Sequence, residues 1–241
     1  PSYWRGRKYE HDAEIIVLKH FFKQIPDDLT LVEIGAGYGR LAKFYLKRVK
    51  KALLLEPSRP LRNKANNDLS KKFKNYKVRQ GYAQKLPVKS RSFDLALMVR
   101  VIHHIEDPGP AFAEVARVLK EEGYFILEFA NKIHWKARFR AFLKGDSNFI
   151  LRLKPTHQQK LHKTFTFVNH HPKKILFLLR KEGFEIVDMH SVSNLRHPKI
   201  KLALPHNILT FLEKYLQEPL AQLRFGPSIF VLAQKKANKS E

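Results

Sequence analysis

Residues 29–39 of this 241-residue chain, LTLVEIGAGYG, decide its fold. The first half, Leu29 to Ile34, is a short, largely apolar run of the kind that forms a buried strand. Glycines then occupy every second position from Gly35 to Gly39, and apolar residues at helical spacing resume with Leu41. Since glycine lets the backbone turn sharply and approach a ligand closely, the stretch predicts a strand, a tight turn and a helix.

The same alternation extends along the chain. Further strands are predicted at 52–55, 76–80, 93–99, 124–129, 184–189 and 229–233. Helices are predicted at 9–24, 59–73, 110–119 and 172–181. Alternating strands and helices with continuously apolar strands indicate an α/β fold, in which helices cover both faces of a parallel sheet.

Two irregular insertions interrupt this rhythm. We therefore expect an N-terminal helical segment (1–28), a core (29–131), a first insertion (132–171), a core continuation (172–195), a second insertion (196–225) and a final core strand (226–236). Insertions of this kind most often build a lid beside the carboxyl ends of the strands, where ligands bind. A helix predicted from His206 to Gln217 is expected to belong to that lid or to a pocket wall.

Composition excludes several classes of protein. Lys and Arg number 46 against 22 Asp and Glu, a formal charge of +24, yet 44% of the residues are hydrophobic, which excludes a disordered basic tail. The absence of cysteine excludes disulfides, a thiolate nucleophile and a Cys-based zinc site. No apolar run approaches the roughly 18 residues of a membrane span, and no signal-peptide h-region is found. We expect a cytoplasmic protein.

A carboxylate accompanies the glycine turn. Glu56 ends the second predicted strand, at about the distance along the chain where an acid accepts the hydroxyls of an adenosine ribose. A dinucleotide-binding fingerprint would need a third glycine at position 40, which is Arg40. The pattern therefore disfavours dinucleotide binding and is still consistent with another ligand that contains adenosine.

Five blocks carry a resemblance to a known family. They are EIGAGYG (33–39), GYAQKLP (81–87), SFDL (92–95), VIHHIEDP (101–108) and ARVLKEEGY (116–124). Together they resemble the successive motifs of class I S-adenosylmethionine (SAM) dependent methyltransferases of the type 11 group, closely over 29–131 and loosely over 172–233. The resemblance implies a Rossmann-like fold: a seven-stranded, mostly parallel sheet with an antiparallel last strand, helices on both faces and an inserted lid.

The resemblance also implies a cofactor and its contacts. The cofactor would be SAM, with S-adenosylhomocysteine (SAH) as product. Glu33 and the glycine turn would face the methionine half, Glu56 the ribose, and Tyr82 with Ala83 the adenine, although the family usually has Asp where this chain has Tyr82. The full set of expected cofactor residues is Glu33, Gly35, Ala36, Gly37, Gly39, Glu56, Pro57, Tyr82, Ala83, Val99 and Arg100.

The methyl acceptor is less determined. Methyl transfer from a sulfonium needs an acceptor placed in line in a dry pocket, so no universal catalytic residue is required. His103 and His104 follow the fourth strand and are candidate general bases, or else structural residues beneath the cofactor. Arg100 is a candidate partner for an anionic acceptor, or else forms a salt bridge to Glu106 or Asp107.

The positive charge lies in two blocks. Residues 40–91 contain 17 Lys and Arg against 2 acids, and residues 132–201 contain 16 against 4. Within the second block, one face of a basic amphipathic helix carries Trp135, Phe139, Phe142 and Leu143. We favour packing of this aromatic face on the core, and the alternative is peripheral membrane contact through residues 132–144. No metal site is expected, because the histidines of the insertion lack ligand spacing.

Three functions follow for testing. The first is a methyltransferase acting at oxygen, carbon or nitrogen of a small-molecule or lipid-like acceptor, which is either neutral or anionic. The second is an RNA methyltransferase that uses the basic surface. The third is a SAM-binding protein without turnover. Fold-level resemblance does not choose among acceptors.

Overall fold

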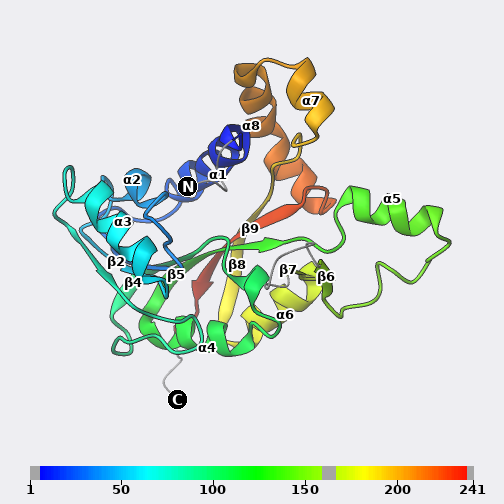
Figure 1. Ribbon diagram of the computed structural model, residues 1–241. Helices are drawn as coiled ribbons and strands as arrows, with labels where there is room; N and C mark the ends of the chain where they lie inside the picture. Colours follow the sequence, from blue (N-terminus) through cyan, green and yellow to red (C-terminus); the bar gives the residue numbers. More distant parts are fainter. Residues whose placement is uncertain (1–5, 159–166, 238–241) are drawn as a thin grey trace.

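The computed structural model describes residues 6–158 and 167–237. Seven strands form one sheet in the order β3-β2-β1-β4-β5-β9-β8 (Figure 1). Their bounds are β1 Thr30–Ile34, β2 Lys51–Leu55, β3 Tyr76–Arg79, β4 Phe93–Met98, β5 Leu119–Ala130, β8 Phe184–Val192 and β9 Ser228–Lys235. β9 runs antiparallel to both β5 and β8, whereas the pairings among β1 to β5 are parallel. The predicted fold class, including its antiparallel last strand, is confirmed.

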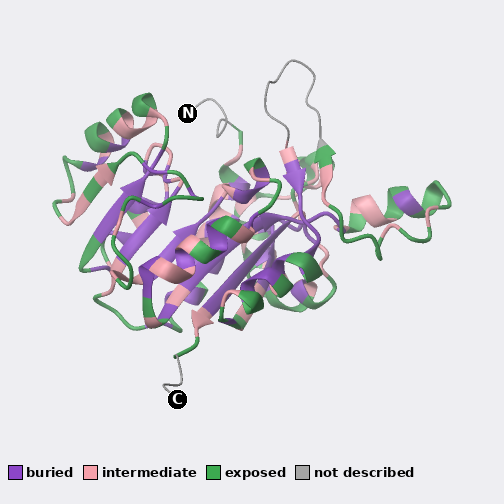
Figure 2. Cartoon of the chain, turned by 90° about the horizontal axis from the view of Figure 1, so that it is seen from below, coloured by how far each residue is buried: buried purple, intermediate pink, exposed green. Residues whose placement is uncertain are grey.

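Helices cover both faces of this sheet, which is why its central strands are largely apolar and buried (Figure 2). On one face α4 and α6 pack through residues such as Phe112 and Ile175. On the other face α1 and α2 pack through residues such as Leu18 and Tyr45. The helices are α1 Lys8–Phe21, α2 Ala42–Tyr45, α3 Arg59–Leu69, α4 Gly109–Val118, α5 Trp135–Leu143, α6 Pro172–Lys181, α7 Pro198–Ala203 and α8 His206–Gln222, with a 3₁₀ turn η2 at Ile102–His104.

Some element bounds differ from the sequence-based predictions. The helix after the glycine turn is only α2, four residues long, because the chain on either side of it is held in turns. The fifth strand begins at Leu119 rather than at residue 124, since Leu119 already pairs with Phe93 of β4. The helix that precedes it accordingly ends at Val118.

The first insertion projects from the sheet. It leaves β5 through α5 and returns through a small hairpin of β6 Thr156–Gln158 and β7 Phe167–Asn169, which no sequence pattern had predicted (Figure 1). Its two ends lie side by side, because the Lys132 backbone N–H donates to the His170 carbonyl (2.9 Å) and the His170 N–H donates to the Ala130 carbonyl (2.8 Å).

The second insertion is mostly not a lid. Its long helix, α8, packs on α1, where the Tyr9 hydroxyl donates to Glu213 (2.5 Å) and the Gln217 amide donates to the Ala13 carbonyl (2.9 Å). The expectation that the helix 206–217 forms a lid or pocket wall is therefore wrong, because its polar buried side chains bind α1 instead. Within the described residues, no helix is long and apolar enough to cross a membrane.

Candidate functional site

The glycine turn lies at the carboxyl end of β1. Gly35, Gly37 and Gly39 have φ values of 72°, 57° and 74°, in the left-handed region that glycine adopts without steric cost. The N–H groups of Gly35 and Ala36 donate to the carbonyl of Leu55 at the end of β2 (2.8 and 3.0 Å). A Cβ at Gly35 would lie 2.4 Å from a methyl carbon of Val101, whereas one at Gly37 would meet only open space. The turn thus leaves room for a ligand above Gly37.

Glu56 is fixed beside that open space. One carboxylate oxygen accepts the Gly37 N–H and the other accepts the Ser58 N–H, both at 2.9 Å. The residue that follows, Pro57, is held through its carbonyl by Arg62 (2.6 Å). Each carboxylate oxygen has a second lone pair, so Glu56 can still accept the two hydroxyls of a ribose.

Glu33 lies beneath the turn and is buried. Its carboxylate accepts a hydrogen bond from the Tyr45 hydroxyl of α2 (2.6 Å). Burial raises the pKa of Glu33 to about 7, although the bond from Tyr45 and the nearby Arg40 oppose this rise. Glu33 therefore changes charge near neutral pH.

The expected adenine contacts follow β3. Residues 80–92 connect β3 to β4 without a helix, and they contain an isolated bridge between Tyr82 and Lys85. The ring of Tyr82 is 54% exposed, while Ala83 is buried. The exposed ring can stack on a base, and its hydroxyl, which accepts from Gln80 (3.3 Å), retains hydrogen-bonding capacity.

Val99 and Arg100 directly follow β4, and Val99 is buried. Arg100 has a φ of 63°, unusual for a residue with a side chain, and its N–H donates to Glu128 (2.8 Å). Its guanidinium donates to Glu14 of α1 (2.8 and 2.6 Å). The alternative salt bridge to Glu106 or Asp107 is wrong, because the guanidinium pairs with the buried carboxylate of Glu14 instead.

Glu14 is a residue that the sequence reasoning missed. It is fully buried between Arg100 and Arg40, whose Nη2 donates to it at 2.5 Å. Burial alone would raise its pKa, but the two guanidinium groups lower it below the usual value. The available signal was its position one and two turns before Leu18 and Phe21, on the apolar stripe of the first helix.

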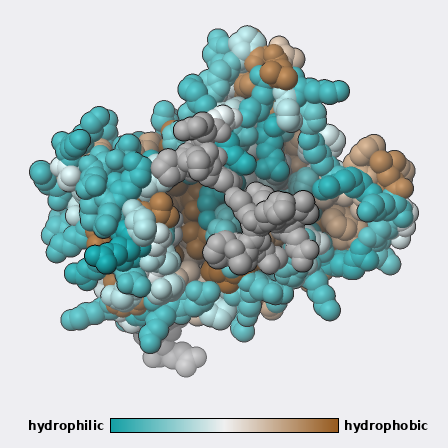
Figure 3. Space-filling model, in the orientation of Figure 1, coloured by the Kyte–Doolittle hydropathy of each residue, from teal (hydrophilic) through white to brown (hydrophobic). Residues whose placement is uncertain are grey.

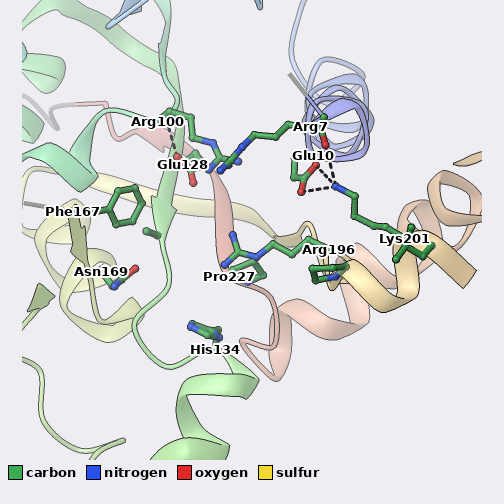
Figure 4. A pocket seen from close by; sticks show the side chains of 14 residues that line it. Arg7, Glu10, Arg100, Glu128, His134, Phe167, Asn169, Arg196, Lys201 and Pro227 are labelled. Carbon is green, nitrogen blue, oxygen red and sulfur yellow. Dashed lines mark hydrogen bonds and ion pairs between the residues drawn. The ribbon is translucent and has the colours of Figure 1, made fainter. Parts of the chain in front are cut away.

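A cavity of about 740 Å³ opens beside Arg100 (Figure 4). Its walls come from the start of α1, the ends of β4 and β5, the first insertion and the loop leading to α7. The lining residues are Gly6, Arg7, Glu10, Arg100, Glu128, Ala130, His134, Phe167, Asn169, Arg196, Pro198, Lys201, Leu202 and Pro227. This is the carboxyl edge of the sheet, where ligands bind in open α/β folds.

The cavity is strongly cationic. Arg7, Arg100 and Arg196 extend into it from three different elements, and Lys201 pairs with Glu10 (3.1 Å). Burial, together with Arg196 and its basic neighbours, lowers the pKa of His134 to about 4. Burial is the larger cause, and the nearby cations act in the same direction, so His134 is neutral at neutral pH.

The two candidate bases lie outside the cavity lining. His103 is buried and its ring stacks on Phe167, with ring centroids 4.3 Å apart. It is Phe167 that lines the cavity. Partial burial lowers the pKa of His104. A general-base role for either histidine stays a prediction.

Two histidines of the first insertion have structural partners. In the first insertion, His170 and His171 bond through Nε2 to the carbonyls of Ile102 and Ile150, both at 2.9 Å. His162 and part of the loop around it lie outside the described residues.

One cluster elsewhere in the described chain has metal-ligand spacing: His20, Asp188 and His190, with ligand atoms within 4.8 Å. Asp188 Oδ2 accepts from Gln24 (2.7 Å) and lies 3.0 and 3.2 Å from the two imidazoles. Burial favours the protonated carboxyl, but these bonds lower the pKa of Asp188 overall. The cluster is a hydrogen-bonded link between α1 and β8, and we assign it no metal.

Comparison with known proteins agrees with this geometry. Residues 32–127 match a family model described as a methyltransferase domain, of the type 11 group. The core of this chain is a SAM-dependent methyltransferase domain. The predicted resemblance is thus confirmed, and SAM is the cofactor of this family and fold.

The relatives match part of this chain. An uncharacterized methyltransferase, YcgJ of Bacillus subtilis, is 33% identical over 98 residues, or 40% of this chain and 39% of that protein. The uncharacterized protein MJ1252 of Methanocaldococcus jannaschii is 30% identical over 175 residues, or 68% of this chain and 65% of that protein. The chain thus spans less than two thirds of either relative.

A solved structure resembles nearly the whole chain. It is a SAM-dependent methyltransferase of Thermotoga maritima, described as a possible histamine N-methyltransferase, with a TM-score of 0.59 and 25% identity. The match covers 95% of this chain and 89% of that one. The two chains therefore share the same overall fold.

The residues of the methyltransferase domain fit SAM chemically. The glycine turn offers open space at Gly37, Glu56 has spare acceptor capacity beside it, and Tyr82 offers an exposed ring. Glu33 sits under the same turn, as the methionine half requires. The assignment of individual SAM contacts to these residues stays a prediction.

Proposed function

We propose that this protein transfers a methyl group from SAM to a small-molecule acceptor that carries an anionic group and binds in the cavity beside Arg100. The observation that carries the proposal is the position of that cavity. It shares Arg100, the residue after Val99 at the end of β4, with the expected cofactor site, so an acceptor bound there lies next to the methyl donor.

Charge selects the class of acceptor. Four Arg and Lys residues line the cavity against two carboxylates; Glu10 is paired with Lys201, and Arg100 is paired with the buried Glu14 behind the lining. Guanidinium groups that extend into one space repel each other, and a carboxylate or phosphate relieves that repulsion through charge-assisted hydrogen bonds. Histamine, named for the Thermotoga relative, is an amine and is cationic at neutral pH, so the cavity argues against the same acceptor here.

The chain's own residues bind the acceptor, orient it and exclude water from the site. SAM supplies the electrophilic methyl on a good leaving group, so placement contributes most of the rate. Arg196 and Arg7 would hold the anionic end of the acceptor, and Phe167 would present an apolar wall. Glu128 receives the Arg100 N–H and the Ser228 hydroxyl, which fixes the strand ends behind the cavity.

A labelling experiment tests the proposal. The protein is incubated with methyl-labelled SAM and fractionated cell extract, and label is measured in small molecules, lipids, RNA and protein. We expect label in an anion-exchange-retained small-molecule or lipid fraction. Label confined to RNA would support the RNA alternative instead, and SAM binding without any transfer would support a protein without turnover.

A further inference from the structure

The first insertion carries an exposed apolar surface. We call residues 132–154, which include α5 and the loop after it, the arm; it projects from the body of the molecule (Figure 1). Seven of the fifteen large apolar side chains that are exposed in the described chain belong to this segment. Figure 3 shows apolar surface gathered over α5 at the right edge of the molecule. The seven are Trp135, Phe139, Phe142, Leu143, Ile150, Leu151 and Leu153.

The arm is attached through its other face. Ala141 is buried, Arg138 donates to the Leu223 carbonyl (2.9 Å), and Trp135 stacks on Phe225 with ring centroids 5.7 Å apart. Phe142, in contrast, is 77% exposed. The favoured expectation that the aromatic face packs on the core holds for Trp135 but is wrong for Phe139, Phe142 and Leu143, because Ala141 and Arg138 occupy the attachment face.

The arm's exposed apolar face is surrounded by cations. Residues 132–154 contain seven Lys and Arg and a single acid, Asp146, which is itself paired with Arg152. Lys132 donates to the carbonyls of Arg152 and Lys154, and this ties the two ends of the arm together. Burying apolar side chains stabilises a complex, so several such side chains left in water indicate a binding surface.

We propose that the arm docks on an anionic lipid bilayer, with Phe139, Phe142 and Leu143 inserting at the headgroup level and the basic side chains contacting lipid phosphates. Charge argues against a second copy of the chain as the occupant, because each copy carries +24 and the arms would repel. The inference goes beyond the proposed methyl transfer and holds whether or not that transfer occurs.

Docking would also place the cavity near the lipid. His134 precedes α5 at its N-cap and lines the cavity. An arm lying on a bilayer therefore brings the cationic cavity within reach of anionic headgroups or of amphiphilic acceptors.

Vesicle co-sedimentation tests the proposal with the whole protein. Vesicles of phosphatidylcholine with about 30% phosphatidylglycerol are compared with phosphatidylcholine alone. We expect binding to the anionic vesicles only, weakened by added salt. The double variant F139A/F142A should lower the affinity about tenfold or more. The control F177A/F211A removes two phenylalanines of similar exposure, 60% each, outside the arm and should bind like the wild type.

A second readout separates insertion from simple charge attraction. The sequence has two tryptophans, Trp4 and Trp135, and Trp135 is already stacked on Phe225, so W4F/W135F/F142W places a single reporter on the exposed face of the arm. Its emission should shift to shorter wavelength with anionic vesicles and remain unshifted in K136E/R140E. Equal affinity of F139A/F142A and wild type for anionic vesicles would overturn the proposal. So would an arm-dependent dimer in size-exclusion chromatography without lipid.

Discussion

At the scale of single residues, Glu33 couples the cofactor turn to pH. Its pKa is raised from 4.5 to about 7 by burial, so between these values the folded chain holds a proton that the unfolded chain releases. The free energy of unfolding therefore decreases as pH rises from about 4.5 to 7 and levels off above. Integrated over that window, the loss is about 3 kcal/mol.

Replacing Glu33 by Gln should remove that pH dependence. The amide keeps an acceptor for the Tyr45 hydroxyl but does not titrate, so E33Q should gain stability over wild type at pH 8 and differ little at pH 5. Urea unfolding at pH 5, 6, 7 and 8 measures this. An unchanged slope against pH in E33Q would contradict the raised pKa.

Glu56 should contribute to cofactor affinity. Glu56→Ala removes the acceptor for the Gly37 N–H and for the expected ribose hydroxyls, and each hydrogen bond to a charged group contributes about 1.5–3 kcal/mol. We expect SAH affinity, measured by calorimetry, to fall about tenfold or more. The matched control is Glu185→Ala, an exposed acid on β8, and it should leave affinity unchanged.

At the scale of elements, α1 is held to the sheet by ion pairs that close one wall of the cavity. Glu14 of α1 is buried against Arg100 and Arg40, and Glu10 meets Lys201 of α7. Since removing one partner of a buried ion pair leaves uncompensated charge, Glu14→Ala should lower the free energy of unfolding by about 3–5 kcal/mol. Chemical denaturation measures this.

The same bonds predict a pH effect of opposite sign to that of Glu33. The depressed pKa of Glu14 gives stability that is present above the unfolded value of 4.5 and is lost as pH falls through the folded value. Glu10→Ala, whose partner Lys201 is partly exposed, should cost less than Glu14→Ala. Equal losses of unfolding free energy in the two variants would contradict a special contribution from the buried Glu14 ion pairs.

The strands and most helices of this molecule could be predicted because the local pattern of apolar and polar residues indicates each of them. Apolar runs such as 93–98, bounded by polar turns, form strands in any sheet that helices cover on both faces. The hairpin of β6 and β7 could not be predicted, since each strand has three residues and depends on its partner. The outward aromatic face of α5 was missed because periodicity identifies a face without saying what it contacts.

At the scale of the whole molecule, the candidate site joins distant parts of the sequence. The glycine turn and Glu56 could be predicted because they lie within one βαβ unit. Arg7 and Arg196 could not, because only the folded chain brings the start of α1 beside the loop before α7. Their contribution to the cavity therefore follows from tertiary structure alone.

This separation makes the acceptor site testable apart from the cofactor site. Arg196→Gln should reduce label transfer from SAM to acceptor fractions about tenfold or more at low acceptor, because a charge-assisted contact is lost. SAH affinity should stay the same. Lys199→Gln, an exposed neighbour outside the cavity, is the matched control. A parallel fall in SAH affinity would assign Arg196 to the cofactor's own carboxylate instead.

The paired ends of the first insertion make that insertion a detachable module. Asn131 and His170 form a parallel bridge, and Asn131 holds the carbonyls of Arg224 and Gly226 from below (2.7 and 2.8 Å). Closing the chain across so short a gap costs little, and loop length itself adds entropy only slowly. A chain in which a short glycine linker replaces residues 133–168 should keep its sheet and still bind SAH. The same chain should lose the acceptor cavity, because His134 and Phe167 line it, so one deletion separates cofactor binding from acceptor binding.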